Sequence, residues 1–226
     1  MRLLPVGTIK ANVSAVLLLL TLLLAKDARA LEKPEYEVLL DLGKIEYRLY
    51  NPYVVVETVV QDEDYDRAVE TGFGRLFDYI SGSNRSTQKI SMTAPVEMAR
   101  TGVEIANTTP MSTSATPEGI RMAFMLPGEY SLQSAPTPED DTVQLRQMPE
   151  RVVAAIRFSG RWTERNLTRA EDRLVQNIAE QNLETVGPSV FAAYNPPFMP
   201  PFFRRNEILF EVNGLPESLR QGSTGD

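Results

Sequence analysis

Residues 89–98 place an apolar side chain at every second position, and this alternation constrains the fold more than any other feature of the chain. The even positions are apolar, while the odd positions carry Lys, Ser, Thr, Pro and Glu. A strict period of two predicts a strand with one buried face. Pro95 cannot donate a ladder hydrogen bond, so we expect an edge, a bulge or a bend there. Because a helical pattern ends near Gly82, the predicted unit is a helix, a tight link and a strand.

The residues before this unit predict a hairpin followed by the helix itself. Alternation at 45–49 and a β-branched run at 53–60 predict two strands that pair around the turn Asn51-Pro52. The acidic stretch 62–64 is typical of a helix start. Apolar residues then recur at helical spacing and predict one apolar face, formed by Tyr65, Val69, Phe73, Leu76, Phe77 and Ile80.

A strand expected at 121–126 completes the first half of the chain, and the second half repeats this order after a connector at 127–142. Its strands are expected at 143–148, 152–159, 190–195 and 207–212. The second hairpin turns at Pro149, and Thr163 begins a helix whose apolar face is Leu167, Ala170, Leu174 and Ile178. The plan β-β-α-β-β therefore occurs twice. It predicts an α+β fold: a curved antiparallel sheet or distorted barrel of about eight strands, with two helices and a pseudo-twofold axis.

The chain of 226 residues contains neither cysteine nor histidine. The missing cysteine excludes disulfides and thiolate chemistry, and the missing histidine removes the commonest general base, zinc ligand and haem ligand. No local arrangement indicates serine–lysine or paired-carboxylate catalysis, so we expect neither an enzyme nor a protein metal site. The net charge of −7 disfavours nucleic acid and anionic membranes as partners.

Residues 1–30 have the pattern of a secretory signal peptide. A positive start precedes a mostly apolar run at 13–25, and Ala28-Arg29-Ala30 forms an A-x-A cleavage site. The run is shorter than the about 20 residues that span a bilayer, so membrane contact is expected only through an uncleaved segment. Cleavage after Ala30 removes four basic and one acidic side chain and changes the formal charge from −7 to −10. We expect an exported protein, in the periplasm of a Gram-negative source, with one domain at 31–226.

Three blocks of the chain resemble the SOUL/haem-binding-protein family. They are Gly72–Val96, which contains KISMTAPV, then Arg121–Trp162, and Tyr194–Glu207, which ends in FRRNE. The resemblance implies a distorted antiparallel barrel with two helices. It also implies that the protein binds haem or another tetrapyrrole without catalysis, as a carrier, buffer or scavenger. Related folds act as small-molecule effector-binding modules.

The same resemblance implies an apolar cleft beside the first helix, without an obligatory histidine ligand. The site residues that it implies are Phe73, Arg75, Leu76, Phe77, Ile80, Lys89 and Met92. Among these, Arg75 and Lys89, or else Arg204 or Arg205 near the end of the chain, would contact the propionates. Axial ligation would come from Met or Tyr, such as Met92 or Tyr79. The chain departs from some relatives at Glu70 and Asp78, where they carry basic residues.

Two alternatives stay open on the sequence. The acidic charge and the two acidic residues on the first helix favour a module that binds another amphipathic small molecule, either cationic or neutral. The apolar turn at 198–203 favours a surface for an unknown protein partner if its side chains are exposed.

Overall fold

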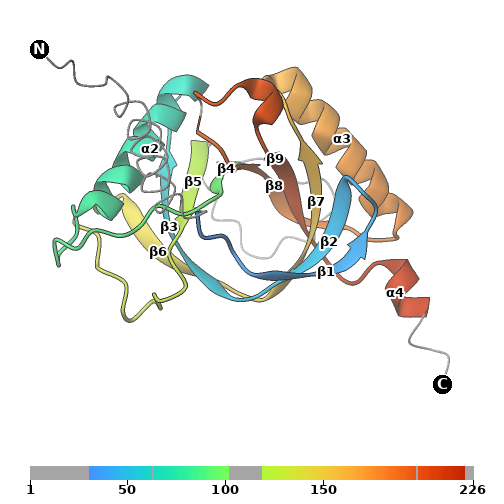
Figure 1. Cartoon of the computed structure of the whole chain (residues 1–226), viewed down its shortest axis with the longest axis horizontal. Helices are drawn as coiled ribbons and strands as arrows, with labels where there is room; N and C mark the ends of the chain where they lie inside the picture. Colours follow the sequence, from blue (N-terminus) through green and yellow to red (C-terminus); the bar gives the residue numbers. More distant parts are fainter. Residues whose placement is uncertain (1–30, 63, 102–118, 197, 222–226) are drawn as a thin grey trace, which may run out of the picture. The chain divides into compact units, whose positions relative to one another are not determined.

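The computed structural model describes residues 31–62, 64–101, 119–196 and 198–221 (Figure 1). The strands are β1 Tyr36–Asp41, β2 Ile45–Tyr50, β3 Tyr53–Val60, β4 Val96–Thr101, β5 Gly119–Met125, β6 Val143–Met148, β7 Arg151–Phe158, β8 Thr185–Ala193 and β9 Asn206–Val212. The helices are α2 Tyr65–Ser81, α3 Glu164–Glu180, the short α4 Glu217–Gln221 and the 3-10 turn η1 Pro201–Phe203. The predicted signal peptide lies outside the described residues. Within the described ranges, no helix is both long and apolar enough to cross a membrane.

The strands on either side of Asn51-Pro52 do not pair with each other. Instead, β2 pairs with β7 and β3 pairs with β6, in one shared antiparallel register that sets Asn51-Pro52 opposite Pro149-Glu150. The hairpins predicted around these prolines are therefore wrong. A two-residue link is the commonest hairpin loop, but it also lets one extended chain bend and continue. Each proline lies where the ladder is interrupted, as expected for a residue without a backbone N–H.

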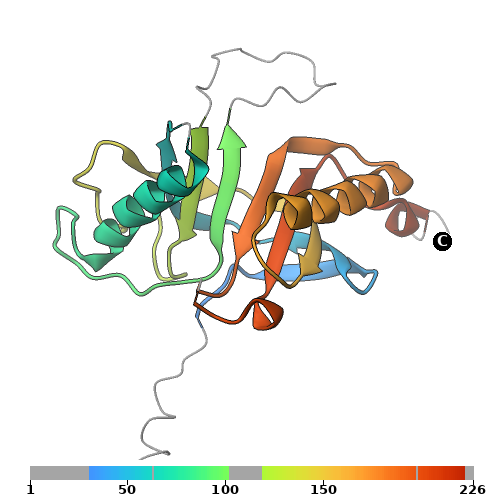
Figure 2. The ribbon, with the colours of Figure 1, turned by 90° about the horizontal axis from the view of Figure 1, so that it is seen from above.

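The described strands form one nine-stranded antiparallel sheet in the order β1-β2-β7-β9-β8-β4-β5-β3-β6. The pair β8–β4 joins two halves of this sheet. Helix α2 contacts β3 and β5 in one half, and α3 contacts β7, β8 and β9 in the other. Both helices lie over the same face of the curled sheet (Figure 2). The predicted curved sheet with two main helices is thus confirmed, and β1 adds a strand that the sequence did not predict.

Both main helices begin as the sequence predicts. The side chains of Asp64 and Thr163 accept hydrogen bonds from backbone N–H groups in the first turns of α2 and α3. Gly82 ends α2 with a φ of 119°, a left-handed conformation that glycine adopts without strain. The residues buried against the sheet recur at the same spacing, as Gly72, Leu76 and Ile80 in α2 and as Ala170, Leu174 and Ile178 in α3. The two helices therefore pack on the sheet in equivalent ways.

Only the last part of residues 89–98 is a strand. β4 begins at Val96, and the preceding residues follow an irregular path. The predicted strand is therefore wrong before Val96, and the break falls at Pro95. The backbone N–H of Ile90 donates to the last turn of α2, and the Thr93 hydroxyl donates to the end of β5. Together with the bond from the Ala94 N–H to the Glu32 carbonyl, these single contacts hold the segment in place without a ladder.

Candidate functional site

Helix α2 exposes two stacked phenylalanine rings, Phe73 and Phe77, which we call the aromatic strip. The two side chains are 41% and 48% exposed, their ring centroids are 5.9 Å apart and their planes differ by 13°. Phe73 also meets the edge of Phe124 of β5 at 5.4 Å. The predicted apolar face of this helix is thus divided, because only part of it turns toward the sheet. The strip offers a flat apolar ligand a ready surface.

The other predicted site residues do not gather around this strip. Leu76 and Ile80 are 0% and 5% exposed and belong to the core. Arg75 is half-buried and donates to Thr58 Oγ1 at 3.3 Å. Lys89 is exposed, and Met92 is half-buried against the core. The α2 surface beside the strip therefore carries two exposed carboxylates, Glu70 and Asp78, while the guanidinium of Arg75 is bonded to Thr58.

Three further ligand candidates already have partners in the fold. The Tyr79 side chain is 1% exposed and its hydroxyl donates to the Pro136 carbonyl at 2.8 Å, so this oxygen is not directed at an open site. Arg205 donates to Glu207, with Nη2 2.7 Å from Oε1, and stacks over the Tyr194 ring. Arg204 Nε donates to the Met199 carbonyl at 2.8 Å. These arginines hold the closing turn of the fold.

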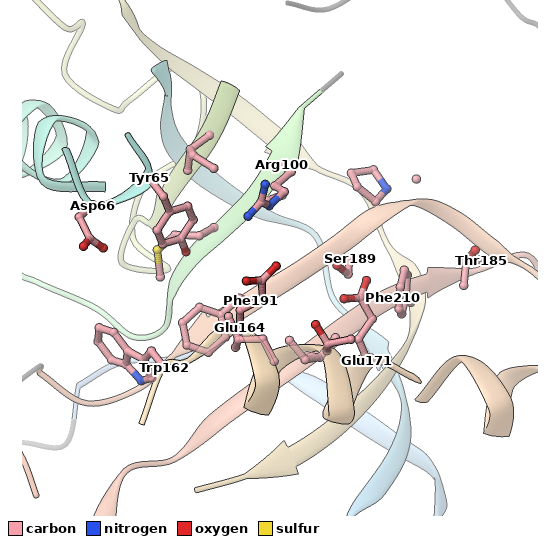
Figure 3. Close-up of a pocket in the computed structure, with 18 residues that line it drawn as sticks. Tyr65, Asp66, Arg100, Trp162, Glu164, Glu171, Thr185, Ser189, Phe191 and Phe210 are labelled. Atoms are coloured by element: carbon pink, nitrogen blue, oxygen red, sulfur yellow. The ribbon is translucent and has the colours of Figure 1, made fainter. Parts of the chain in front are cut away.

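A groove of about 660 Å³ opens between the N-terminal parts of α2 and α3 (Figure 3). Its floor is apolar and comes from four strands, with Met98 of β4, Ile120 of β5, Phe191 of β8, and Ile208 and Phe210 of β9. Trp162 forms one wall, with its ring centroid 5.7 Å from that of Phe191. The volume is typical of sites for small organic molecules. None of the seven site residues predicted from the family lines this groove.

The groove exists because the two halves of the sheet separate at this point. β4 and β8 pair from Val96 and Ala193 to Met98 and Phe191, and no further within the described strands. Beyond that, β8 carries a register shift against β9 that contains Gly187 and Pro188. Gly187 has a φ of 75°, and Pro188 has no N–H to donate. These two residues turn β8 away from β4 and leave the space open.

The groove carries an uneven set of charges. Asp66 from α2 and Glu164 and Glu171 from α3 line it, against Arg100 from β4. The Arg100 guanidinium lies 5.7 Å from the centroid of the Tyr65 ring, on the side opposite Glu164 and Glu171 (Figure 3). Burial raises the pKa of the Tyr65 phenol, so its hydroxyl stays neutral at physiological pH. An apolar floor beneath three carboxylates and one guanidinium favours a ligand that is both apolar and positively charged.

A buried charged cluster on the other face of the sheet explains the FRRNE motif. Glu207 is 0% exposed and accepts hydrogen bonds from Arg48, Arg205 and Tyr194, with Arg48 Nη1 2.7 Å from Oε2. Burial alone would raise the pKa of Glu207, but Arg48 and Arg205 outweigh burial and hold the pKa below its ordinary value. The cluster joins β2 to β9 and has a structural role.

The proline-rich turn exposes three further aromatic side chains, as the sequence allowed. Phe198, Phe202 and Phe203 are 86%, 70% and 69% exposed, and the last two rings contact each other with centroids 4.4 Å apart. The sequence did not predict the groove, whose residues come from six segments spread over the chain. Trp162, the last residue of the second family-like block, lines the groove, and its Nε1 donates to Asn206 at 2.8 Å.

Sequence comparisons agree on one family. The model of the family described as SOUL heme-binding protein matches residues 31–211. The chain is 30% identical over 186 residues to heme-binding protein 2 of Mus musculus, covering 80% of this chain and 85% of that protein. It is 26% identical over 188 residues to heme-binding protein 1 of Xenopus laevis, covering 83% of this chain and 86% of the relative.

Structural comparisons agree with the fold. The C-terminal domain of EcmrR superposes with a TM-score of 0.57 at 9% identity, covering 77% of this chain and all of that domain. An uncharacterized conserved protein from Listeria innocua superposes with a TM-score of 0.52 at 13% identity, covering 75% and 92% of the two chains. At such identities the likeness concerns the fold alone. The sequence match over residues 31–211 carries the assignment: the chain belongs to the SOUL heme-binding protein family.

Proposed function

We propose that this protein binds haem or a related tetrapyrrole without transforming it, and that the aromatic strip on α2 is the surface that receives the macrocycle. One observation carries the proposal: Phe73 and Phe77 stand exposed and stacked on the first helix of a SOUL-family chain. A tetrapyrrole is flat and largely apolar, and two parallel rings match that shape. The bound iron would supply any redox chemistry, while this chain would bind and orient the ring.

The strip alone gives only part of a useful affinity. Covering two half-exposed phenylalanine rings removes on the order of 150 Å² of apolar surface from water, or about 4 kcal/mol at about 25 cal/mol per Å². That free energy corresponds to a dissociation constant of about 1 mM before the costs of association. Tighter binding therefore needs further contacts, such as propionate contacts with Arg75 or Lys89 or a contact between Met92 and the iron.

The charges beside the strip act against the propionates. Glu70 and Asp78 are exposed on α2, and Arg75 already donates to Thr58. Replacing Asp78 with Lys would substitute attraction for repulsion at the surface. For an exposed charge this is worth about 1 kcal/mol, or about fivefold in affinity. We expect Asp78→Lys to tighten haem binding by that amount and high salt to reduce the gain.

A haem titration followed by absorbance tests the proposal. We expect saturable binding with a shifted Soret band in the wild type and its loss in the double variant Phe73→Asp/Phe77→Asp. Val175→Asp is the matched control, because Val175 is 44% exposed on α3 and occupies the position equivalent to Phe77. Unchanged binding by a folded double variant would contradict a site on α2, and no saturable binding by the wild type would contradict tetrapyrrole binding itself.

We also propose that the protein works outside the cytoplasm as a carrier or buffer. The support is the pattern at 13–25 and the A-x-A site at 28–30. N-terminal sequencing of the protein recovered from the periplasm of a Gram-negative host is expected to begin at Leu31. A mature protein that retains residues 1–30 would contradict cleavage.

A further inference from the structure

We infer that the groove between α2 and α3 is a second binding site, and that it takes an organic cation with a flat aromatic body. This site is separate from the aromatic strip, which supplies none of its lining. The inference does not rest on tetrapyrrole binding, because the groove is defined by its own shape and charge. Its ligand has the opposite sign of charge to haem, whose propionates are anionic.

The apolar part of such a ligand would meet aromatic side chains. Tyr65, Trp162, Phe191 and Phe210 all line the groove, and they come from both helical halves of the molecule. Aromatic rings bind flat apolar molecules through burial and stacking, and the negative faces of their π systems attract a cation. Arg100 and Arg204 already lie over the rings of Tyr65 and Trp162, at 5.7 and 5.1 Å, so a bound cation would rely on Phe191, Phe210 and the carboxylates of the groove. The floor thus suits a ligand that combines both properties.

The three carboxylates that line the groove favour a positively charged ligand. Asp66 and Glu164 lie in the first turns of α2 and α3, where the helix dipole stabilises an acidic side chain. The helix dipole does not explain the acidic side chain of Glu171, which lies in the middle of α3 and is half-buried at the groove. Among the described residues, no lysine or arginine forms an ion pair with any of these three carboxylates. A partly desolvated carboxylate without a counter-charge favours a cationic ligand.

The repeat in the fold supports this assignment. When the buried positions of the two helices are matched, with Leu76 on Leu174 and Ile80 on Ile178, Glu171 corresponds to Phe73. The packing requirements of the two helices are the same, so packing against the sheet does not require an acidic residue at this position. Glu171 is therefore the residue whose charge we expect to matter most for the ligand.

The single tryptophan of the chain reports on the groove. Because Trp162 lines it, a bound aromatic ligand should quench the tryptophan fluorescence of the full-length protein. The probe is the 10-methylacridinium cation, and acridine-9-carboxylate is the control of similar ring shape and opposite charge. We expect saturable quenching by the cation that weakens at high salt, and none by the anion at the same concentrations.

Charge-neutral variants locate the contact. Glu171→Gln is expected to weaken cation binding about fivefold, the effect of about 1 kcal/mol from one partly exposed charge. Asp172→Asn is the matched control, because it removes one charge from an exposed neighbour on α3 that does not line the groove. Ser189→Phe, which fills the groove, should abolish quenching while far-ultraviolet circular dichroism shows an intact fold.

Three outcomes would overturn the inference: equal affinity in Glu171→Gln and Asp172→Asn, equal quenching by the anion, or no saturable quenching by the cation at millimolar concentration. The double variant Phe73→Asp/Phe77→Asp separates this site from the haem site. It should keep cation binding unchanged while it loses haem binding. Loss of both ligands together would show that they share one site.

Discussion

The two helices bury equivalent side chains but expose different ones. Leu76 and Leu174 are both 0% exposed and hold α2 and α3 against the sheet at the same point of the repeat. Three residues before and one residue after this leucine, α2 presents Phe73 and Phe77, whereas α3 presents Glu171 and Val175. The comparison teaches that the repeat preserves the contacts that specify the fold. The surfaces available to ligands have diverged, one toward aromatic and one toward acidic side chains.

The other face of the sheet shows the same kind of divergence. Strands β2 and β3 pair with β7 and β6 in one continuous antiparallel register, which we call the long ribbon. Arg48 in β2 and Arg146 in β6 occupy equivalent places in it, each opposite a valine of the partner strand. Arg48 is 2% exposed and bonds to the fully buried Glu207. Arg146 is 36% exposed and bonds to Glu57, which is 16% exposed. Equivalent arginines therefore form a buried ion pair in one half and a partly hydrated one in the other.

The largest expected effect separates these two ion pairs. Glu207→Ala would leave the buried Arg48 guanidinium with only the partly exposed Glu46 as a counter-charge, and it should lower the free energy of unfolding by about 3–5 kcal/mol. Glu57→Ala removes the partner of Arg146 and of Arg121, but these side chains are 36% and 25% exposed and water can solvate them, so the loss should be smaller, about 1 kcal/mol. Urea unfolding of both variants measures the difference. Equal losses would show that the two pairs are energetically equivalent despite their different burial.

Truncating the matched core residues should give similar losses in the two halves. Leu76→Ala and Leu174→Ala each remove a fully buried side chain, and each is expected to cost about 2–5 kcal/mol. Thermal unfolding followed by circular dichroism compares them. If one variant unfolds with the melting temperature of the wild type, the corresponding helix is not packed as its burial indicates.

Acid should destabilise the folded protein by protonating Glu207, which lies in the second half of the chain. Its pKa lies below the ordinary value of 4.5 in the folded state, so its contribution to stability is complete above pH 4.5 and is lost as the pH falls through the lowered pKa. Glu207→Gln removes this titration. Melting temperatures between pH 3 and 7 should therefore fall less steeply in the variant than in the wild type, and parallel curves would contradict the assignment.

The smallest effect concerns the helix starts. Asp64→Ala and Thr163→Ala each remove one side-chain acceptor at an N-terminus, which is worth about 1 kcal/mol. Amide hydrogen exchange should increase in the first turn of the altered helix and not in the other helix. Asp64→Asn and Thr163→Ser keep an acceptor and serve as controls, and exchange in these variants equal to that of the alanine variants would exclude a capping role.

The sequence predicted the features that depend on neighbouring residues. Asp64, Thr163 and Gly82 mark helix ends through contacts within a few residues, so their signals are local and were correctly interpreted. The β-branched run of β3 and the alternation in β9 each report one strand at a time and gave the positions of these strands to within a residue. Element order was therefore accessible, and with it the repeat and the curved sheet.

Pairing across long separations could not be predicted in the same way. The links at Asn51-Pro52 and Pro149-Glu150 have the length of hairpin loops, yet the strands beside them pair with residues about a hundred positions away. The alternation at 89–95 arises from separate contacts with α2 and β5 rather than from a ladder. The groove depends on where β4 leaves β8, and no local pattern encodes that point.

The long ribbon also determines how the chain can be divided. β2, from the first repeat, lies in the half-sheet of the second, and β6, from the second repeat, lies in the half-sheet of the first. Each repeat thus completes its neighbour by an intramolecular exchange of strands. A cut in the connector at 127–142 would yield two fragments with incomplete half-sheets, because the first would lack β6 and the second would lack β1 and β2. Folding must bring distant segments together before either half is complete, which makes assembly of this domain a slow, all-or-none event.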